Sequence, residues 1–220
     1  MIALVCLAAA LLSVERIAYI LIWRNPAGFS RWSTHGVVAA FGGPVDLLVI
    51  LFAAFKLIQI AVFVGWHFAF GDGTLWPQSR DPKVIAVGAL LIALGQALNV
   101  SVFNRLGRVG VFYGNKFGHT VAWCRTFPFT WFEHPQYVGT VLAIWGLFFA
   151  MRFPSPDWIV LPLLESIYYT AGARLERDPP GATAQSGRDE QHDQARHHGE
   201  IRQQRAPFTA DDQRTVPQRK

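Results

Sequence analysis

Charged residues and cysteines are scarce in this chain. Of its 220 residues only 16% are charged, whereas 51% are hydrophobic. The charges are also unevenly distributed, because 14 of them lie in residues 178–220. The two cysteines, Cys6 and Cys124, provide neither a disulfide framework nor the spacing of metal ligands, so we predict packing roles for both and no metal site. Residues 1–177 are therefore more apolar than a soluble domain of this size requires.

Segments of about ten residues with alternating hydrophobicity are absent as well, which argues against membrane-spanning strands. Five apolar stretches instead approach the roughly 20 residues that a helix needs to cross a bilayer. They are Ile2 to Trp23, Val45 to Trp66, Val84 to Asn104, Tyr137 to Met151, and Trp158 to Ala173. In lipid, backbone groups must pair within their own segment. We therefore predict an all-α integral membrane protein, a small bundle of four or five transmembrane helices.

The first apolar stretch resembles a signal peptide in length. It lacks a basic start, however, and its apolar pattern resumes after Glu15-Arg16, so we interpret it as a retained or re-entrant segment. Trp23-Arg24-Asn25-Pro26 should end it, because proline and the residue before it resist helix continuation. The second stretch should begin after Gly42-Gly43-Pro44.

Besides Glu15 and Arg16 in the first stretch, three charged side chains lie within the apolar stretches: Asp46, Lys56 and Glu165. Asp46 and Lys56 should face the bundle interior or reach toward the interface. Asp46 and Lys56 are not spaced as a local pair, and we assign Lys56 no chemistry. Glu165 is expected either to pair with a polar group of the third stretch or to be a buried protonated acid. The third stretch also carries alanines at positions 89, 93 and 97, which form a smooth face for close helix packing.

The formal net charge of +5 suits an anionic membrane surface. No basic stripe interleaved with aromatic residues is present, so we predict no nucleic-acid partner. With all five stretches as spans, the excess of Arg and Lys places the loop of residues 105–135 in the cytosol. Residues 178–220 are polar with little to bury, which predicts a disordered tail beyond a membrane domain of residues 1–177. The sequence indicates no oligomeric state.

Residues Glu133 to Gly139 open an apolar hairpin that closes about forty residues later, at Arg174-Leu175-Glu176. The polar turn at one end and the carboxylate at the other should lie at the same membrane face. Such a face can bring a polar cofactor to a lipid.

The stretch from about 84 to 176 resembles the phospholipid methyltransferase family, which methylates phosphatidylethanolamine and its partly methylated forms. The matching elements are Gly107-x-x-Gly110-x-x-x-Gly114-x-x-x-Gly118, Phe127-Pro128-Phe129, His134-Pro135-Gln136-Tyr137-Val138-Gly139, and Glu176. The His-Pro-x-Tyr-x-Gly element is also similar to that of isoprenylcysteine carboxyl methyltransferases. It therefore indicates fold and cofactor better than substrate.

The resemblance implies S-adenosylmethionine as methyl donor, bound near a Gly-x-Gly in a membrane helix and a Glu-Glu pair at the end of the last helix. The first element aligns with Ala93-Leu94-Gly95, and the second with Glu176-Arg177, so each keeps one of the family's two residues. Arg177 reverses a charge beside the expected donor ammonium. The cofactor-binding residues that the resemblance implies are Ala93, Gly95, His134, Pro135, Gln136, Glu176 and Arg177.

Methyl transfer from a sulfonium to an amine is an in-line displacement, in which the protein mainly aligns two bound reactants. The amine must lose a proton, so we predict His134 or Glu133 as the base, with Tyr137 beside them as the third catalytic candidate. From the residues alone, without the resemblance, the role expected first for His134 is to cap a helix that begins near Pro135.

Both the sulfonium and the methylated amine are cations, which aromatic faces stabilise. Tyr113, Trp131 and Tyr137 are therefore candidate wall residues, although Trp131 and Tyr137 also suit interfacial anchors. The lipid phosphate would suit Lys116 or Arg125, unless these touch only bilayer head groups.

The resemblance implies a methyltransferase that converts phosphatidylethanolamine, or its mono- and dimethyl derivatives, toward phosphatidylcholine. Its partners would be the bilayer and its phospholipid substrate. The family implies the endoplasmic reticulum membrane, with a mitochondrial membrane as alternative. Two other functions stay open: methylation of a prenylated cysteine carboxylate, and a non-catalytic scaffold or lipid binder.

Overall fold

The computed structural model describes residues 1–71, 73–121 and 124–176; Arg177 and the tail of residues 178–220 lie outside these ranges. The described residues contain helices and no strand. In order they are α1 (Ile2–Arg24), α2 (Pro26–Ser33), η1 (Gly36–Phe41), α3 (Pro44–Phe70), α4 (Pro82–Val111), η2 (Gly114–Phe117), α5 (Pro135–Arg152), η3 (Pro156–Ile159) and α6 (Val160–Leu175). By length and composition, α1, α3 and α4 are long and apolar enough to cross a membrane. The predicted all-α membrane architecture is confirmed.

The helices begin where proline permits it. Proline occupies the start of α2, α3, α4 and α5, where its missing N–H has no helical partner to lose. Asn25 caps α2 by accepting a hydrogen bond from the Gly28 backbone N–H at 2.9 Å. The predicted breaks before Pro26 and Pro44 are thus confirmed. The predicted end of the third stretch at Asn104 is too early, because α4 continues to Val111 across a kink at Gly107 (φ 62°).

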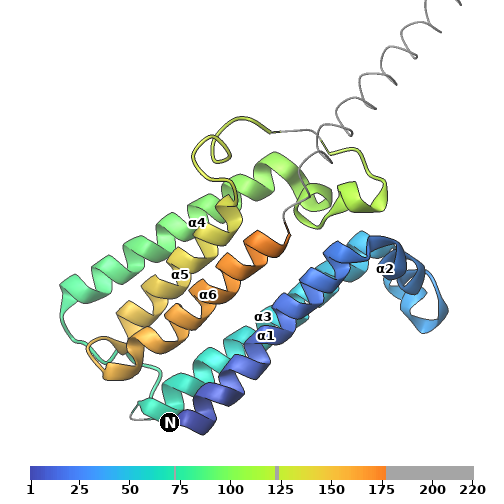
Figure 1. Cartoon of the computed structure of the whole chain (residues 1–220). Coiled ribbons are helices and arrows are strands. Elements are labelled where there is room, and N and C mark those ends of the chain that lie inside the picture. Colours follow the sequence, from blue (N-terminus) through green and yellow to red (C-terminus); the bar gives the residue numbers. More distant parts are fainter. Residues whose placement is uncertain (72, 122–123, 177–220) are drawn as a thin grey trace, which may run out of the picture. The chain divides into compact units, whose positions relative to one another are not determined.

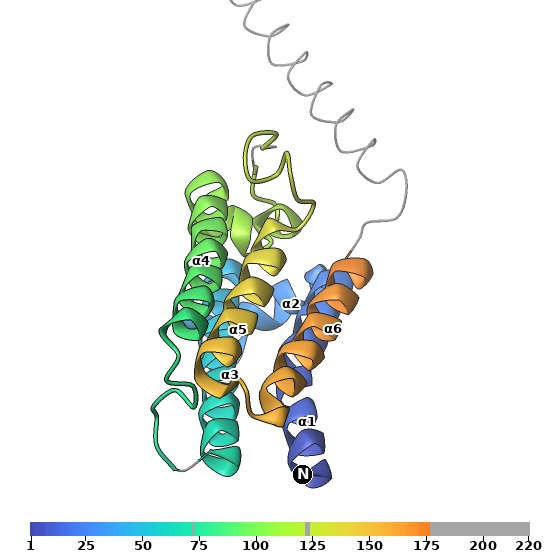
Figure 2. The same cartoon turned by 90° about the vertical axis from the view of Figure 1, so that its left-hand side faces the viewer.

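The long helices pack in a sequence of neighbours rather than all against all. α4 lies along α5, α5 beside α6, α6 beside α1, and α1 beside α3 (Figures 1 and 2). Within the described residues, α3 and α4 are not packed closely together. The apolar side chains of the two core clusters fill the interior at either end, around Leu161 in one and Leu48 in the other. The space between α3 and α4 remains for a cavity.

The α4–α5 contact is the closest in the bundle because glycine faces glycine twice. A β-carbon on Gly139 would lie 2.6 Å from the Gly95 carbonyl oxygen, and one on Gly146 would lie 2.6 Å from that of Gly88. Small residues allow such backbone approach between membrane helices. The predicted alanine face is wrong in this respect: the alanines at 89, 93 and 97 are exposed, and α5 packs on the glycine face instead.

A buried ion pair joins three helices at the end of the bundle away from Glu176. Arg152 Nη2 and Nε lie 2.6 and 2.9 Å from the two carboxylate oxygens of Asp157, and Nη2 also donates to the Phe70 carbonyl oxygen at 2.7 Å. Trp66 Nε1 donates to the same carboxylate at 2.9 Å. Asp157 lies in η3, just before α6, and connects α3 to α5.

Replacing Gly146 with alanine should destabilise the fold. The added methyl group would overlap the Gly88 carbonyl, and overpacking of this kind costs about 1–3 kcal/mol. Gly65→Ala in α3 is the matched control, because nothing lies within 4 Å of its β-carbon position. Alanine there should raise the free energy of unfolding by about 0.5–1 kcal/mol through its higher helix propensity. Thermal unfolding of both variants in detergent measures the difference. Equal melting temperatures would contradict the close α4–α5 contact.

Candidate functional site

A cavity of about 770 Å³ lies inside the bundle. Its walls come from α1, α3, α4, α5 and α6, and most of its lining residues belong to α3, α4 and α5. Ile60, Val100 and Phe103 line it and are also exposed at the protein surface. The cavity therefore opens laterally between α3 and α4, toward the side of the bundle that would face lipid.

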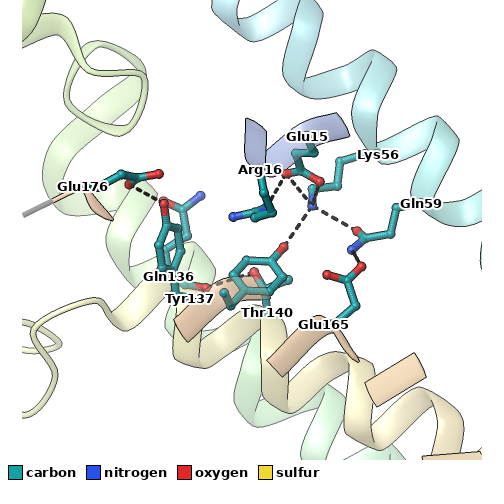
Figure 3. A network of polar contacts seen from close by, with 10 residues as sticks. Glu15, Arg16, Lys56, Gln59, Gln136, Tyr137, Thr140, Glu165 and Glu176 are labelled. Carbon is teal, nitrogen blue, oxygen red and sulfur yellow. Dashed lines mark hydrogen bonds and ion pairs between the residues drawn. The ribbon is translucent and has the colours of Figure 1, made fainter. Parts of the chain in front are cut away.

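Charged groups meet on one wall of this cavity (Figure 3). Glu15 Oε1 lies 2.6 Å from Arg16 Nη2 and 3.2 Å from Lys56 Nζ, so one carboxylate serves two cations. Lys56 also donates to the Gln59 side-chain oxygen at 3.0 Å and to the Tyr169 hydroxyl at 3.2 Å. The Arg16 guanidinium lies over the Tyr169 ring, 4.0 Å from its centroid, where the ring face favours a cation.

Two sequence predictions are resolved by this network. Lys56 does face the bundle interior, as expected. Glu165 does not pair with the third apolar stretch: its partner is Gln59 of α3, whose side-chain nitrogen donates to it at 2.6 Å. The polar side chains of α4, Gln96 and Asn99, line the cavity instead.

The predicted meeting of the two hairpin ends is present in the structure. Tyr137, in the first turn of α5, donates a hydrogen bond of 2.5 Å from its hydroxyl to Glu176 Oε2, at the end of α6. Tyr113 interacts with both of these residues. Glu176 is buried, and this burial raises the pKa of its carboxyl, with the Tyr137 and Tyr113 hydroxyls acting in the opposite direction. Tyr113, Gln136 and Tyr137 all line the cavity.

His134 and Glu133 lie on the other side of the Tyr137 ring. They line a separate pocket of about 480 Å³ with Trp131 and the outer faces of α5 and α6. The His134 ring stacks on Tyr137 at 5.7 Å, and its Nε2 lies 3.9 Å from Glu133 Oε1. The His134 backbone carbonyl begins α5, but its side chain makes no capping hydrogen bond. Tyr137 and Tyr169 line both pockets and together form the wall between them.

The remaining predicted residues are more scattered. Pro135 is buried at the first position of α5. Gly95 faces Gly139 and Ala93 is exposed, so neither lines the cavity. Lys116 lies 4.1 Å over the Trp23 ring, and Arg125 is exposed.

Arg16, Gln59 and Tyr169 are cavity residues that the sequence prediction missed. A signal was available for Arg16, because Glu15-Arg16 interrupts an apolar stretch, and ionisable residues inside such stretches usually mark a functional interior. Tyr169 gave no signal of its own, since aromatic residues are common throughout these helices.

Long apolar helices around a laterally open, mainly apolar cavity with one charged wall define a membrane-embedded bundle that can bind an amphipathic ligand. Comparison with known sequences agrees: residues 84–178 match the family described as phospholipid methyltransferase. A human protein named phosphatidylethanolamine N-methyltransferase is 33% identical over 169 residues, covering 72% of this chain and 82% of that protein. The chain belongs to the phospholipid methyltransferase family.

A second relative is the Arabidopsis thaliana protein named phosphatidyl-N-methylethanolamine N-methyltransferase. It is 36% identical over 81 residues, covering 34% of this chain, and the matched region spans about half, 49%, of that protein's length. No solved structure matches the chain significantly. These relatives favour the phospholipid family over the carboxyl methyltransferases that share the His-Pro-x-Tyr-x-Gly element.

The Tyr137–Glu176 hydrogen bond should contribute measurably to stability. Tyr137→Phe keeps the ring but removes the hydroxyl, and a hydrogen bond to a charged group contributes about 1.5–3 kcal/mol. Tyr168→Phe is the matched control on α6, because its hydroxyl donates to the neutral Ala9 carbonyl at 2.9 Å, a bond worth only about 0.5–1.5 kcal/mol. Thermal unfolding of the two variants gives the comparison. A smaller loss for Tyr137→Phe than for Tyr168→Phe would argue against the contact.

Proposed function

We propose that this protein transfers methyl groups from S-adenosylmethionine to the amine of phosphatidylethanolamine or of its mono- and dimethyl derivatives, toward phosphatidylcholine. The observation that carries the proposal is the contact between Tyr137 and Glu176 at the edge of a laterally open cavity. Membership of the phospholipid methyltransferase family supports the reaction class. The names of the human and Arabidopsis relatives support the lipid amine as acceptor.

Glu176 is suited to hold the ammonium group of the donor's amino-acid part. Its carboxylate is buried, and one oxygen already accepts from Tyr137. A carboxylate accepts several hydrogen bonds at once, and those from charged donors are the strong ones. When bound, S-adenosylmethionine supplies a methyl group on a positively charged sulfur. Gln136 and the backbone beside Pro135 lie next to Tyr137, where they would contact the rest of the donor.

The lateral opening suits an acceptor that stays in the bilayer. A phospholipid can place its head group between α3 and α4 while its acyl chains remain outside, against exposed apolar side chains such as Ile60 and Val100. Binding both reactants in one cavity would align them for transfer. The aromatic rings of Tyr113 and Tyr137 line the cavity, where they would stabilise the cationic product amine.

The acid–base roles follow from the position of Tyr137 between the two pockets. Tyr137 is the proposed catalytic residue in direct contact with the substrates. We propose His134 as the base and Glu133 as its neighbour. Both line the outer pocket behind the Tyr137 ring, so the amine proton would have to pass Tyr137 to reach them. Trp131 would then be an interfacial residue, and Lys116 and Arg125 would contact bilayer head groups.

The proposed location is the endoplasmic reticulum membrane, with a mitochondrial membrane as the alternative. The positive-inside rule supports a cytosol-facing site, because the loop that precedes Glu133 carries the excess of basic residues.

Glu176→Gln should weaken donor binding by about tenfold or more, because a neutral amide replaces the carboxylate that holds an ammonium group. Titration calorimetry on the purified chain in detergent measures the affinity. Asp46→Asn is the control, since that carboxylate pairs with Arg108 near the surface and should leave donor affinity unchanged. Unchanged affinity in Glu176→Gln would remove Glu176 from the site.

The acceptor is tested by supplying a methyl-labelled donor and separating the products by thin-layer chromatography. Labelled mono-, di- or trimethylated phospholipid is the expected product. A labelled ester of a prenylated cysteine would instead identify a carboxyl methyltransferase. Failure of the wild-type chain to bind the donor at all would favour a non-catalytic scaffold or lipid binder.

A further inference from the structure

We propose that Arg16 binds the α-carboxylate of the methyl donor while Glu176 binds its α-ammonium group, so that α1 and the end of α6 together recognise the donor's amino-acid part. The inference rests on the proposed function, because it takes S-adenosylmethionine as the ligand. It adds a residue far from the elements that carry the family resemblance, which begins at residue 84.

The first reason is that the Arg16 guanidinium is incompletely paired. Arg16 is only 7% exposed and lines the cavity. Nη2 is bound to Glu15, but Nε and Nη1 are buried and have no hydrogen-bond partner among the described residues. Leaving such donors unsatisfied away from water is costly. A bound oxyanion would supply the missing acceptors.

The second reason is the direction in which the free nitrogen atom lies. A β-carbon on Gly172 would be 3.8 Å from Arg16 Nη1 and 3.9 Å from the Tyr137 ring. Gly172 is one helical turn before Glu176, whose backbone N–H donates to the Gly172 carbonyl at 2.9 Å. Figure 3 shows Arg16 between the Tyr137–Glu176 pair and the Glu15–Lys56 pair. The free face of the guanidinium therefore belongs to the same region as the Glu176 carboxylate.

The third reason concerns charge. Glu15 contacts both Arg16 and Lys56, and the Glu165 and Glu176 carboxylates also interact electrostatically with Arg16. This cluster therefore holds no excess positive charge before a ligand binds. The amino-acid part of the donor, whose ammonium and carboxylate charges cancel, would add no net charge to it.

An α-amino acid fits these requirements because its ammonium and carboxylate groups are attached to a single carbon atom. The residues that bind them must therefore carry opposite charges and lie near each other, as Arg16 and Glu176 do. The phosphodiester of a lipid is another oxyanion that Arg16 could bind. In that case Arg16 would contact the methyl acceptor rather than the donor. The two sources are separable by experiment.

The test compares S-adenosylmethionine with decarboxylated S-adenosylmethionine, which keeps the ammonium and sulfonium groups but lacks the carboxylate. Both are titrated into the full chain in detergent free of phospholipid. The wild-type chain should bind the complete donor roughly 10- to 100-fold more tightly, as expected for charge-assisted hydrogen bonds. Arg16→Gln should abolish most of that preference, and Arg16→Lys should keep only part of it.

Arg108→Gln is the matched control, because it removes one positive charge from an exposed pair with Asp46 and should keep the wild-type preference. Equal wild-type affinity for the two ligands would overturn the inference without any variant. The inference would also be overturned if Arg16→Gln kept the full wild-type preference for S-adenosylmethionine over its decarboxylated form. If Arg16→Gln raised the KM for the lipid but left the donor affinity unchanged, the inference would also be overturned, because Arg16 would then bind the phosphodiester. Absence of binding of either ligand to the wild-type chain would refute the proposed function together with this inference.

Discussion

A carboxylate shared by two cations inside an apolar bundle is the interaction on which the interior of this protein depends. A lone charge in the hydrocarbon layer is expensive, so Glu15, Arg16 and Lys56 are stable there only together. Their partners come from α1, α3 and α6, which fixes how these helices are rotated against one another. Because α3 is thereby tied to α1 and α6, while α4 is packed on α5, an open space between α3 and α4 is retained.

The glycine contact between α4 and α5 gives the other half of the architecture. Gly95 aligns with a family element associated with the donor, yet its closest neighbour in the structure is the Gly139 backbone. A glycine required by packing places the first turn of α5, and with it Tyr137, against the cavity. The family glycine can thus influence the site through the backbone of α5. Ala93 points away from that contact, so its methyl group disturbs neither the packing nor the cavity.

Helix identity and helix starts could be predicted from the sequence because they are set locally, by apolar length and by proline and glycine. The proximity of Tyr137 and Glu176 could also be predicted from the sequence, because a hairpin of two helices brings its two ends to the same membrane face. The Glu15–Lys56 and Gln59–Glu165 pairs were not, because they join residues 41 and 106 positions apart. Such pairings depend on how the helices are rotated, which spacing within one helix does not reveal. For the same reason the glycine face was overlooked in favour of the alanines.

The ion pair between Arg152 and Asp157 has a consequence for lipid movement. It holds the ends of α3 and α5 together, and the Phe63 and Phe148 rings pack edge to face beside it, with centroids 5.1 Å apart. Among the described helices, the Arg152 end is therefore tied together, and the lateral opening between α3 and α4 is the route that remains for a ligand. Under the proposed function, a lipid head group would enter and leave by this one opening.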